Sequence, residues 1–203
     1  MSPSLETSAQ RRAQILDAAS AVFARNGVHQ ARMEDIAAEV GLSKPALYLY
    51  FANKDALVAE LMRRLFDLEL ADLRALEEAP GTVGDRLLAF HDVILRQYAE
   101  MAVHAPLFWE FYALAIRDTG VRRVVRDYLR AIRGRLEALI KQGVDRGELR
   151  PVDPRAPAIA ILAIYEGLVV LCATDPRTIG WKEQADSAVR LLLAGLASGS
   201  PGT

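Results

Sequence analysis

Between residues 44 and 54 the chain places ammonium and phenol donors in one short segment, on Lys44, Tyr48, Tyr50 and Lys54. Ammonium and phenol groups donate to anionic acceptors such as phosphate oxygens, and a lysine can also donate to O6 or N7 of guanine. The chain contains no His-Glu-x-x-His, no Gly-x-Ser-x-Gly and no phosphate-binding glycine loop. This chemistry favours binding of a polyanion over catalysis.

The segment before Lys44 predicts a short helix that ends in a tight turn. Ile36, Ala37 and Val40 give it one apolar face at helical spacing. Gly41 follows at once, at a place where a residue with a positive φ angle commonly ends a helix.

The segment from Ser43 predicts a second short helix. Ser43 can cap its first turn, and Pro45 falls in the turn that tolerates proline. Leu47 and Phe51, four residues apart, share the face that would pack on the first helix. Two short helices joined by a glycine turn form a helix-turn-helix, whose second helix lies in the major groove of DNA.

This pattern resembles the TetR family of one-component repressors. The matching residues keep a fixed spacing through the first helix and the helix-turn-helix: Ile15, Ala18, Ala19, Phe23, Gly27, Ile36-Ala37, Gly41-Leu42-Ser43, Leu47 to Phe51, and Lys54 to Leu57. One position departs from the family, because Arg32 stands where a threonine often caps the second helix. Arginine is a poor N-cap, so either this cap is weaker or Arg32 contacts a phosphate.

The resemblance implies which residues contact DNA. Lys44, Pro45 and Ala46 match the positions that face the bases, and Tyr48, Tyr50 and Lys54 match positions that contact phosphates. Arg32 and Ser43 complete the predicted DNA-binding set. The alternative for Lys44 is an ordinary surface lysine. We expect at least one of the two tyrosine hydroxyls to face outward, because both cannot point into a small three-helix core.

Composition and helical periodicity indicate an all-α protein. Of 203 residues, 52% are hydrophobic, the formal net charge is −1, and the N-terminal residues contain no apolar signal segment. We therefore predict a cytoplasmic protein. Three scattered histidines and one cysteine offer no metal-ligand spacing, so no metal or cofactor is expected. The resemblance implies nine helices, with a three-helix helix-turn-helix domain over residues 1–53, a six-helix ligand-binding and dimerisation domain over 54–198, and a flexible tail over 199–203.

Aromatic residues gather in the region where the family binds its effector. The stretch from Phe108-Trp109-Glu110-Phe111 to Gly147-Glu148-Leu149-Arg150-Pro151 also resembles the branch of the family whose best-known member senses choline. We predict an apolar or cationic small-molecule effector, because aromatic walls suit both kinds of ligand. The alternative is ordinary core packing of these residues. The predicted ligand-binding residues are His91, Tyr98, Phe108, Trp109, Tyr112, Tyr128 and Glu166.

The apolar stretch from Ala156 to Ala173 approaches the length of a membrane span. Glu166 inside it, Pro157 near its start and the lack of a second such stretch favour a buried helix in a protein that does not enter a membrane. In the TetR family the last two helices pair with those of a second subunit. The predicted dimer-interface residues are Leu162, Tyr165, Val169, Ala188, Leu192 and Gly195.

These observations predict a ligand-responsive repressor that binds a palindromic operator of double-stranded DNA as a homodimer and is released by a small molecule. The alternative is a soluble helical ligand-binding protein or enzyme in which the helix-turn-helix is only structural. Binding to a promoter fragment separates the two.

Overall fold

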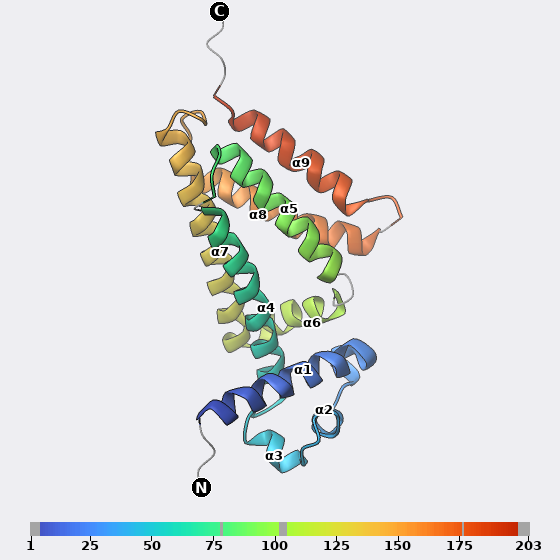
Figure 1. The fold of residues 1–203 in the computed structure, drawn as a ribbon. Helices are drawn as coiled ribbons and strands as arrows, with labels where there is room; N and C mark the ends of the chain where they lie inside the picture. The colour runs from blue at the N-terminus through green and yellow to red at the C-terminus, as the bar shows by residue number, and fades with distance from the viewer. Residues whose placement is uncertain (1–4, 78, 102–104, 176, 199–203) are drawn as a thin grey trace, which may run out of the picture. The chain divides into compact units, whose positions relative to one another are not determined.

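The computed structural model describes residues 5–77, 79–101, 105–175 and 177–198, and the predicted tail 199–203 lies outside this part of the chain. Nine helices cover most of the described residues, as Figure 1 shows. They are α1 (Leu5–Gln30), α2 (Met33–Glu39), α3 (Lys44–Tyr48), α4 (Lys54–Glu77), α5 (Val83–Met101), α6 (Ala105–Arg117), α7 (Thr119–Asp145), α8 (Arg155–Thr174) and α9 (Trp181–Leu196). Strand-like pairing within the described ranges is limited to an isolated bridge between Leu149 and Ala197. The predicted all-α fold is confirmed.

The helices divide into two compact units. The first holds residues 1–68 and 100–128, and the second holds 69–99 and 129–203. The first unit extends beyond the helix-turn-helix, because α1 packs on α6 as well as on α2. The first unit therefore includes α6 and the beginnings of α4 and α7.

The first unit is built around the apolar face of α1. Ile15, Ala19 and Phe23 are buried on this face at helical spacing. Gly27 breaks the helix with a φ angle of 73°, which a residue without a Cβ adopts without strain.

An aromatic cluster fills another part of the first unit. The ring of Phe66 in α4 stacks on Tyr128 in α7 with centroids 3.7 Å apart, and it meets Phe111 in α6 edge-on at 5.8 Å. Phe111 is fully buried. Because these rings come from three helices, their packing ties α4, α6 and α7 together.

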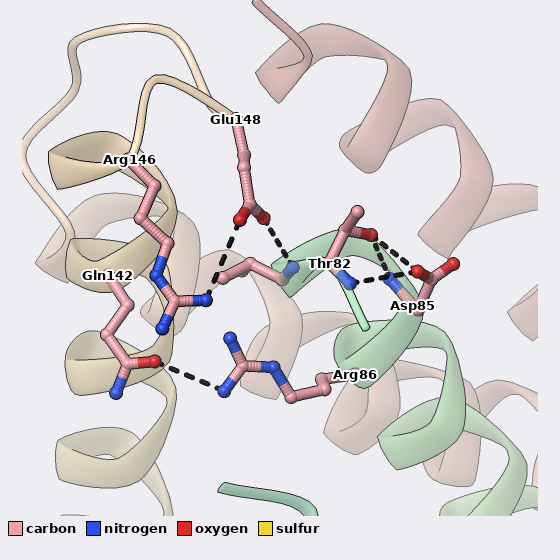
Figure 2. A network of polar contacts seen from close by, with 7 residues as sticks. Thr82, Asp85, Arg86, Gln142, Arg146 and Glu148 are labelled. Carbon is pink, nitrogen blue, oxygen red and sulfur yellow. Dashed lines mark hydrogen bonds and ion pairs between the residues drawn. The ribbon is translucent and has the colours of Figure 1, made fainter. Parts of the chain in front are cut away.

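In the second unit, α8 packs against α9. Polar contacts also join α5 to α7 and to the segment that follows α7 (Figure 2). Arg86 in α5 donates to the side chain of Gln142 in α7 at 3.1 Å. Glu148, just after α7, accepts the backbone amide of Val83 at the start of α5. Arg150 donates to the carbonyl of Gly195 at 2.7 Å, so the chain after α7 is also tied to α9.

One helix among the described residues, α8, is long and apolar enough to span a membrane by length and composition. Its apolar side chains divide between two faces. Ile161 and Leu168 are buried within the unit, whereas Ile159, Val170 and Leu171 are exposed. A helix can be apolar on two faces, one packed within its unit and one at the surface. Such a helix resembles a membrane-spanning helix in composition.

Candidate nucleic-acid interface

The turn between α2 and α3 has the geometry that the sequence predicts. Gly41 has a φ angle of 69°, and the amide of Leu42 donates back to the carbonyl of Ala37 at 2.8 Å. Ser43 is the N-cap of α3, and its Oγ accepts the amide of Ala46 at 3.3 Å. These local bonds fix the path of the chain into α3.

Burial of one side of each helix leaves the other side of α3 at the surface. Ile36 in α2, with Leu47 and Phe51 after the turn, is buried in the core. Lys44, Pro45 and Tyr48 are exposed, and 42% of Tyr48 is accessible. Tyr50 and Ala46 are half-buried. The expectation that at least one tyrosine faces outward is therefore confirmed.

Lys44 forms an ion pair with Glu34 in the first turn of α2. The hydrogen bond and charge of Glu34 raise the pKa of the Lys44 ammonium, and the hydrogen bond from Lys44 lowers the pKa of Glu34. Both groups stay ionised at neutral pH, so the principal cation of α3 has an anion beside it.

The N-terminus of α2 is capped from inside the helix. Arg32 is the N-cap residue, and its backbone amide donates to Oδ2 of Asp35 at 2.8 Å. This bond resembles half of a capping box and compensates for the missing threonine. The guanidinium of Arg32 has no acceptor atom, so it cannot cap the helix itself.

Arg12 of α1 holds the segment that follows α3. Its Nη1 donates to the carbonyl of Tyr50 at 2.7 Å, and its guanidinium carbon lies 4.3 Å from the centre of the Phe51 ring. A further contact with Glu60 of α4 is 3.7 Å long. Arg12 thus fixes the backbone at Tyr50, one of the two predicted DNA-binding tyrosines.

Lys54, at the start of α4, bonds to the segment at the end of α1. Its Nζ donates to the carbonyls of Val28, His29 and Ala31 at 2.7, 3.1 and 3.1 Å. Carbonyls at a helix end lack partners within the helix, and these three lie at or just after the end of α1. The ammonium thus has three acceptors within the protein, and the phosphate contact of this side chain stays a prediction. These hydrogen bonds join α4 to the end of α1.

The predicted effector residues fall in both compact units, and each unit is described by itself. In the first unit Trp109 is partly exposed, Tyr112 meets Phe111 edge-on, and Tyr128 stacks on Phe66. The side chains of Tyr98 and Phe108 lie outside the described residues. A hollow of about 310 Å³ between α1 and α4 is lined by other residues: Leu16, Glu60, Arg63, Arg64, Asp67 and Leu68.

In the second unit His91 is buried, and both of its ring nitrogens have partners. Nδ1 lies 2.9 Å from the Tyr165 hydroxyl, and Nε2 lies 2.6 Å from a carboxylate oxygen of Asp186. Burial raises the pKa of Tyr165. Glu166 is half-buried on α8. His91 therefore joins three helices as a polar element of the core.

The predicted dimer-interface residues differ in exposure. Tyr165 is buried, and its hydroxyl lies 2.9 Å from Nδ1 of His91 within the same unit, while its place at the interface stays a prediction. The remaining positions are half-buried or exposed: Leu162, Val169, Ala188, Leu192 and Gly195. The large apolar side chains that are exposed on the same two helices are Ile159, Val170, Leu171 and Leu191.

Sequence reasoning missed Glu34, Arg12 and Asp186. Each has its partner on another helix, so helical spacing carries no signal for the pair. The one available hint was chemical, since a buried histidine on an apolar helix face needs a polar partner somewhere in the chain.

The geometry defines a class of protein: a helix-turn-helix protein whose second helix presents hydrogen-bond donors on an exposed face. Comparison with known proteins then identifies the family. Residues 15–61 match the model of the N-terminal region of the bacterial regulatory proteins of the TetR family. Residues 83–198 match the C-terminal region of the BetI-type transcriptional repressors.

Individual proteins agree with these matches. The uncharacterised HTH-type transcriptional regulator YfiR of Bacillus subtilis is 30% identical over 83% of this chain and 84% of its own. A putative transcriptional regulator from Saccharomonospora viridis, solved with choline, has a TM-score of 0.82 at 20% identity over 93% of this chain and 98% of its own. The SmeT–triclosan complex has a TM-score of 0.74 at 22% identity, covering 96% of each chain. At these identities the two structures show a common fold.

The chain belongs to the TetR family of bacterial regulatory proteins. It is a DNA-binding transcriptional repressor of the ligand-regulated type.

Proposed function

We propose that this repressor binds a palindromic operator as a homodimer, with α3 of each subunit in the major groove, and that a small-molecule effector releases it. The observation that carries the proposal is the division of α3 into two faces. Leu47 is buried, whereas Lys44, Pro45 and Tyr48 face outward. An exposed face with donors at the start of a second helix is what groove binding needs.

Within this proposal the predicted DNA-binding residues have two tasks. Lys44, Pro45 and Ala46 contact base edges, where an ammonium suits guanine and a methyl group suits thymine. The second task is to contact the phosphate backbone of the DNA and hold α3 in register, and it falls to Arg32, Ser43, Tyr48 and Tyr50. Lys54 contributes through its backbone amide at the start of α4, where a helix N-terminus favours a phosphate. The ammonium of its side chain bonds to carbonyl groups of the protein.

The dimer is proposed from the apolar surface of α8 and α9. Val170, Leu171 and Leu191 are exposed there, and a second copy of the same two helices would cover them. A twofold dimer presents two α3 helices to half-sites about 34 Å apart or a multiple of that distance, which matches a palindromic operator.

The proposed effector is an apolar or cationic small molecule. The S. viridis regulator binds choline and SmeT binds triclosan, and both share this fold. Aromatic rings such as Trp109 and Tyr112 can cover an apolar ligand or hold a cation at their faces, and Glu166 can neutralise a cation. Release requires that the effector prefer the conformation that does not fit the operator. We place the protein in the cytoplasm, without a catalytic activity.

The test starts with duplexes selected by the purified protein from a random pool. A Lys44→Ala variant should bind the selected operator about 5- to 100-fold more weakly, because each half-site loses a base contact. Fluorescence anisotropy of the labelled operator measures this loss. Unchanged affinity and unchanged base preference would show that α3 does not face the groove as proposed. Failure of the wild type to select any sequence would favour a structural helix-turn-helix.

A further inference from the structure

The surface formed by α2 and α3 carries more negative than positive charge. Residues 33–48 contain Glu34, Asp35 and Glu39 but only one cation, Lys44. Carboxylates repel phosphates, so a nucleic-acid interface of this composition needs an explanation for each of them.

Two of the three carboxylates stabilise the protein itself. Asp35 accepts the backbone amide of Arg32 at 2.8 Å and caps α2. Glu39 forms an ion pair with Arg25 of α1 at 2.5 Å, and this pair joins α1 to the end of α2. Both roles are complete without DNA.

Glu34 differs, because its partner is the residue assigned to the bases. It lies in the first turn of α2 and pairs with Lys44, the first residue of α3. The side chains are 51% exposed for Lys44 and 52% for Glu34, so the pair stands at the surface. An ammonium has three donors and a carboxylate has two acceptor oxygens. After the ion pair forms, both groups can still bond outward.

Toward its surroundings, the ion pair of Lys44 and Glu34 presents a hydrogen-bond donor beside a hydrogen-bond acceptor. In the major groove a G·C pair presents the acceptors N7 and O6 of guanine beside the N4 amine donor of cytosine. An A·T pair presents an acceptor, a donor, an acceptor and a methyl group in sequence. A lysine on guanine with a carboxylate on the adjacent cytosine amine satisfies the edge of G·C and leaves the ion pair intact.

We infer that Glu34 is a specificity-determining residue, which recognises a G·C base pair jointly with Lys44. The inference rests on the proposed placement of α3 in the major groove. A duplex without the cytosine amine leaves the carboxylate next to acceptors, and the phosphate backbone adds further repulsion. Glu34 thus lowers the affinity for other sequences more than it lowers the affinity for the operator.

The experiment compares Glu34→Gln with Glu39→Gln in the full-length protein. Both variants remove one exposed negative charge from α2, but only the first changes the partner of Lys44. Binding is measured to the selected operator and to duplexes in which each base pair is replaced in turn. Glutamine also suits the N7 and N6 atoms of adenine, so Glu34→Gln should reduce discrimination at one G·C position by at least about fivefold. Lys44→Ala should reduce discrimination at that same position.

The control separates recognition from simple charge. Glu39→Gln should change affinity for all duplexes similarly and leave base preference as in the wild type, because Glu39 pairs with Arg25 of α1 and not with a residue assigned to the bases. The inference would be overturned if Glu34→Gln kept the base preferences of the wild type. It would also be overturned if Glu34→Gln changed the preference at a base pair where Lys44→Ala has no effect. If Lys44→Ala itself has no effect, the proposed placement of α3 fails instead. Thermal melting of each variant checks that its fold is retained.

Discussion

His91 and Asp186 form a hydrogen bond 2.6 Å long between Nε2 and Oδ1, which joins α5 to α9. The carboxylate can only accept, so Nε2 donates this bond, and the other ring nitrogen, Nδ1, lies 2.9 Å from the hydroxyl of Tyr165 in α8. Lys182 also contacts Asp186, at 2.6 Å. Hydrogen bonds from His91 and Lys182 lower the pKa of Asp186 to about 2.

The lowered pKa of Asp186 predicts how stability depends on acid. A carboxylate whose pKa is lower in the folded state stabilises the protein at pH values above its unfolded pKa of about 3.9. This contribution is lost as the pH falls from about 4 toward about 2. The free energy of unfolding of the wild type should therefore exceed that of Asp186→Asn near neutral pH, and the difference should shrink over this interval. Urea unfolding followed by circular dichroism measures it. A difference that stays constant down to the lowest pH would contradict the role of the charge.

The contacts of Lys54 predict a loss of stability upon its removal. Lys54→Met leaves three carbonyls at the end of α1 without their donor, which should lower the free energy of unfolding by about 1–3 kcal/mol. The dependence of operator affinity on salt distinguishes this role from a phosphate contact. A side chain bound to phosphate contributes about 0.9 to the slope of log K against log salt at each site. We expect the slope to stay that of the wild type, and a slope reduced without any loss of stability would restore the phosphate contact.

The exposed leucine on α9 predicts the outcome of an interface mutation. Leu191→Glu should convert the dimer to a monomer, because assembly would bury an unpaired carboxylate. Ile116→Glu on α6 is a matched control, since both residues are 75% exposed. Sedimentation velocity at micromolar concentration should show a monomer for the first variant and a dimer for the second. Operator affinity should fall with the loss of the dimer. A monomeric wild type would rule out the proposed assembly.

The two tryptophans of the chain allow a direct test of the effector site. In a Trp181→Phe variant, Trp109 remains as the reporter of fluorescence. Choline and triclosan serve as the cationic and the apolar probe, and the proposal expects at least one to change this fluorescence and to release operator. Trp109→Ala should remove the release while operator binding without effector stays intact. If Trp109→Ala released the operator as the wild type does, Trp109 would have only a packing role.

Much of the architecture was predictable because its causes are local. The apolar spacing of Ile36, Leu47 and Phe51, the cap at Ser43 and the turn at Gly41 act between residues a few positions apart. The same kind of signal places α8 close to the apolar stretch from Ala156 to Ala173. These features depend on backbone geometry that each short segment carries by itself.

The partners of individual side chains were not predictable in this way. The spacing that makes Tyr165 a plausible interface residue describes only its place around α8, and its hydroxyl turns inward because His91 of α5 lies there. Lys54 matched a family position for phosphate binding, yet its ammonium also donates to three carbonyls at or just after the end of α1.

By itself the sequence determined the helices, the turn of the helix-turn-helix and the residues available on α3. Only the tertiary structure decided that Lys44 is paired with Glu34, that Lys54 is bound to the end of α1, and that His91 has partners on both of its nitrogens. Helix formation depends on hydrogen bonds and contacts within about four residues, so the local sequence specifies it. Ion pairs and buried hydrogen bonds depend on which distant helices pack together, and that choice is made by the core as a whole.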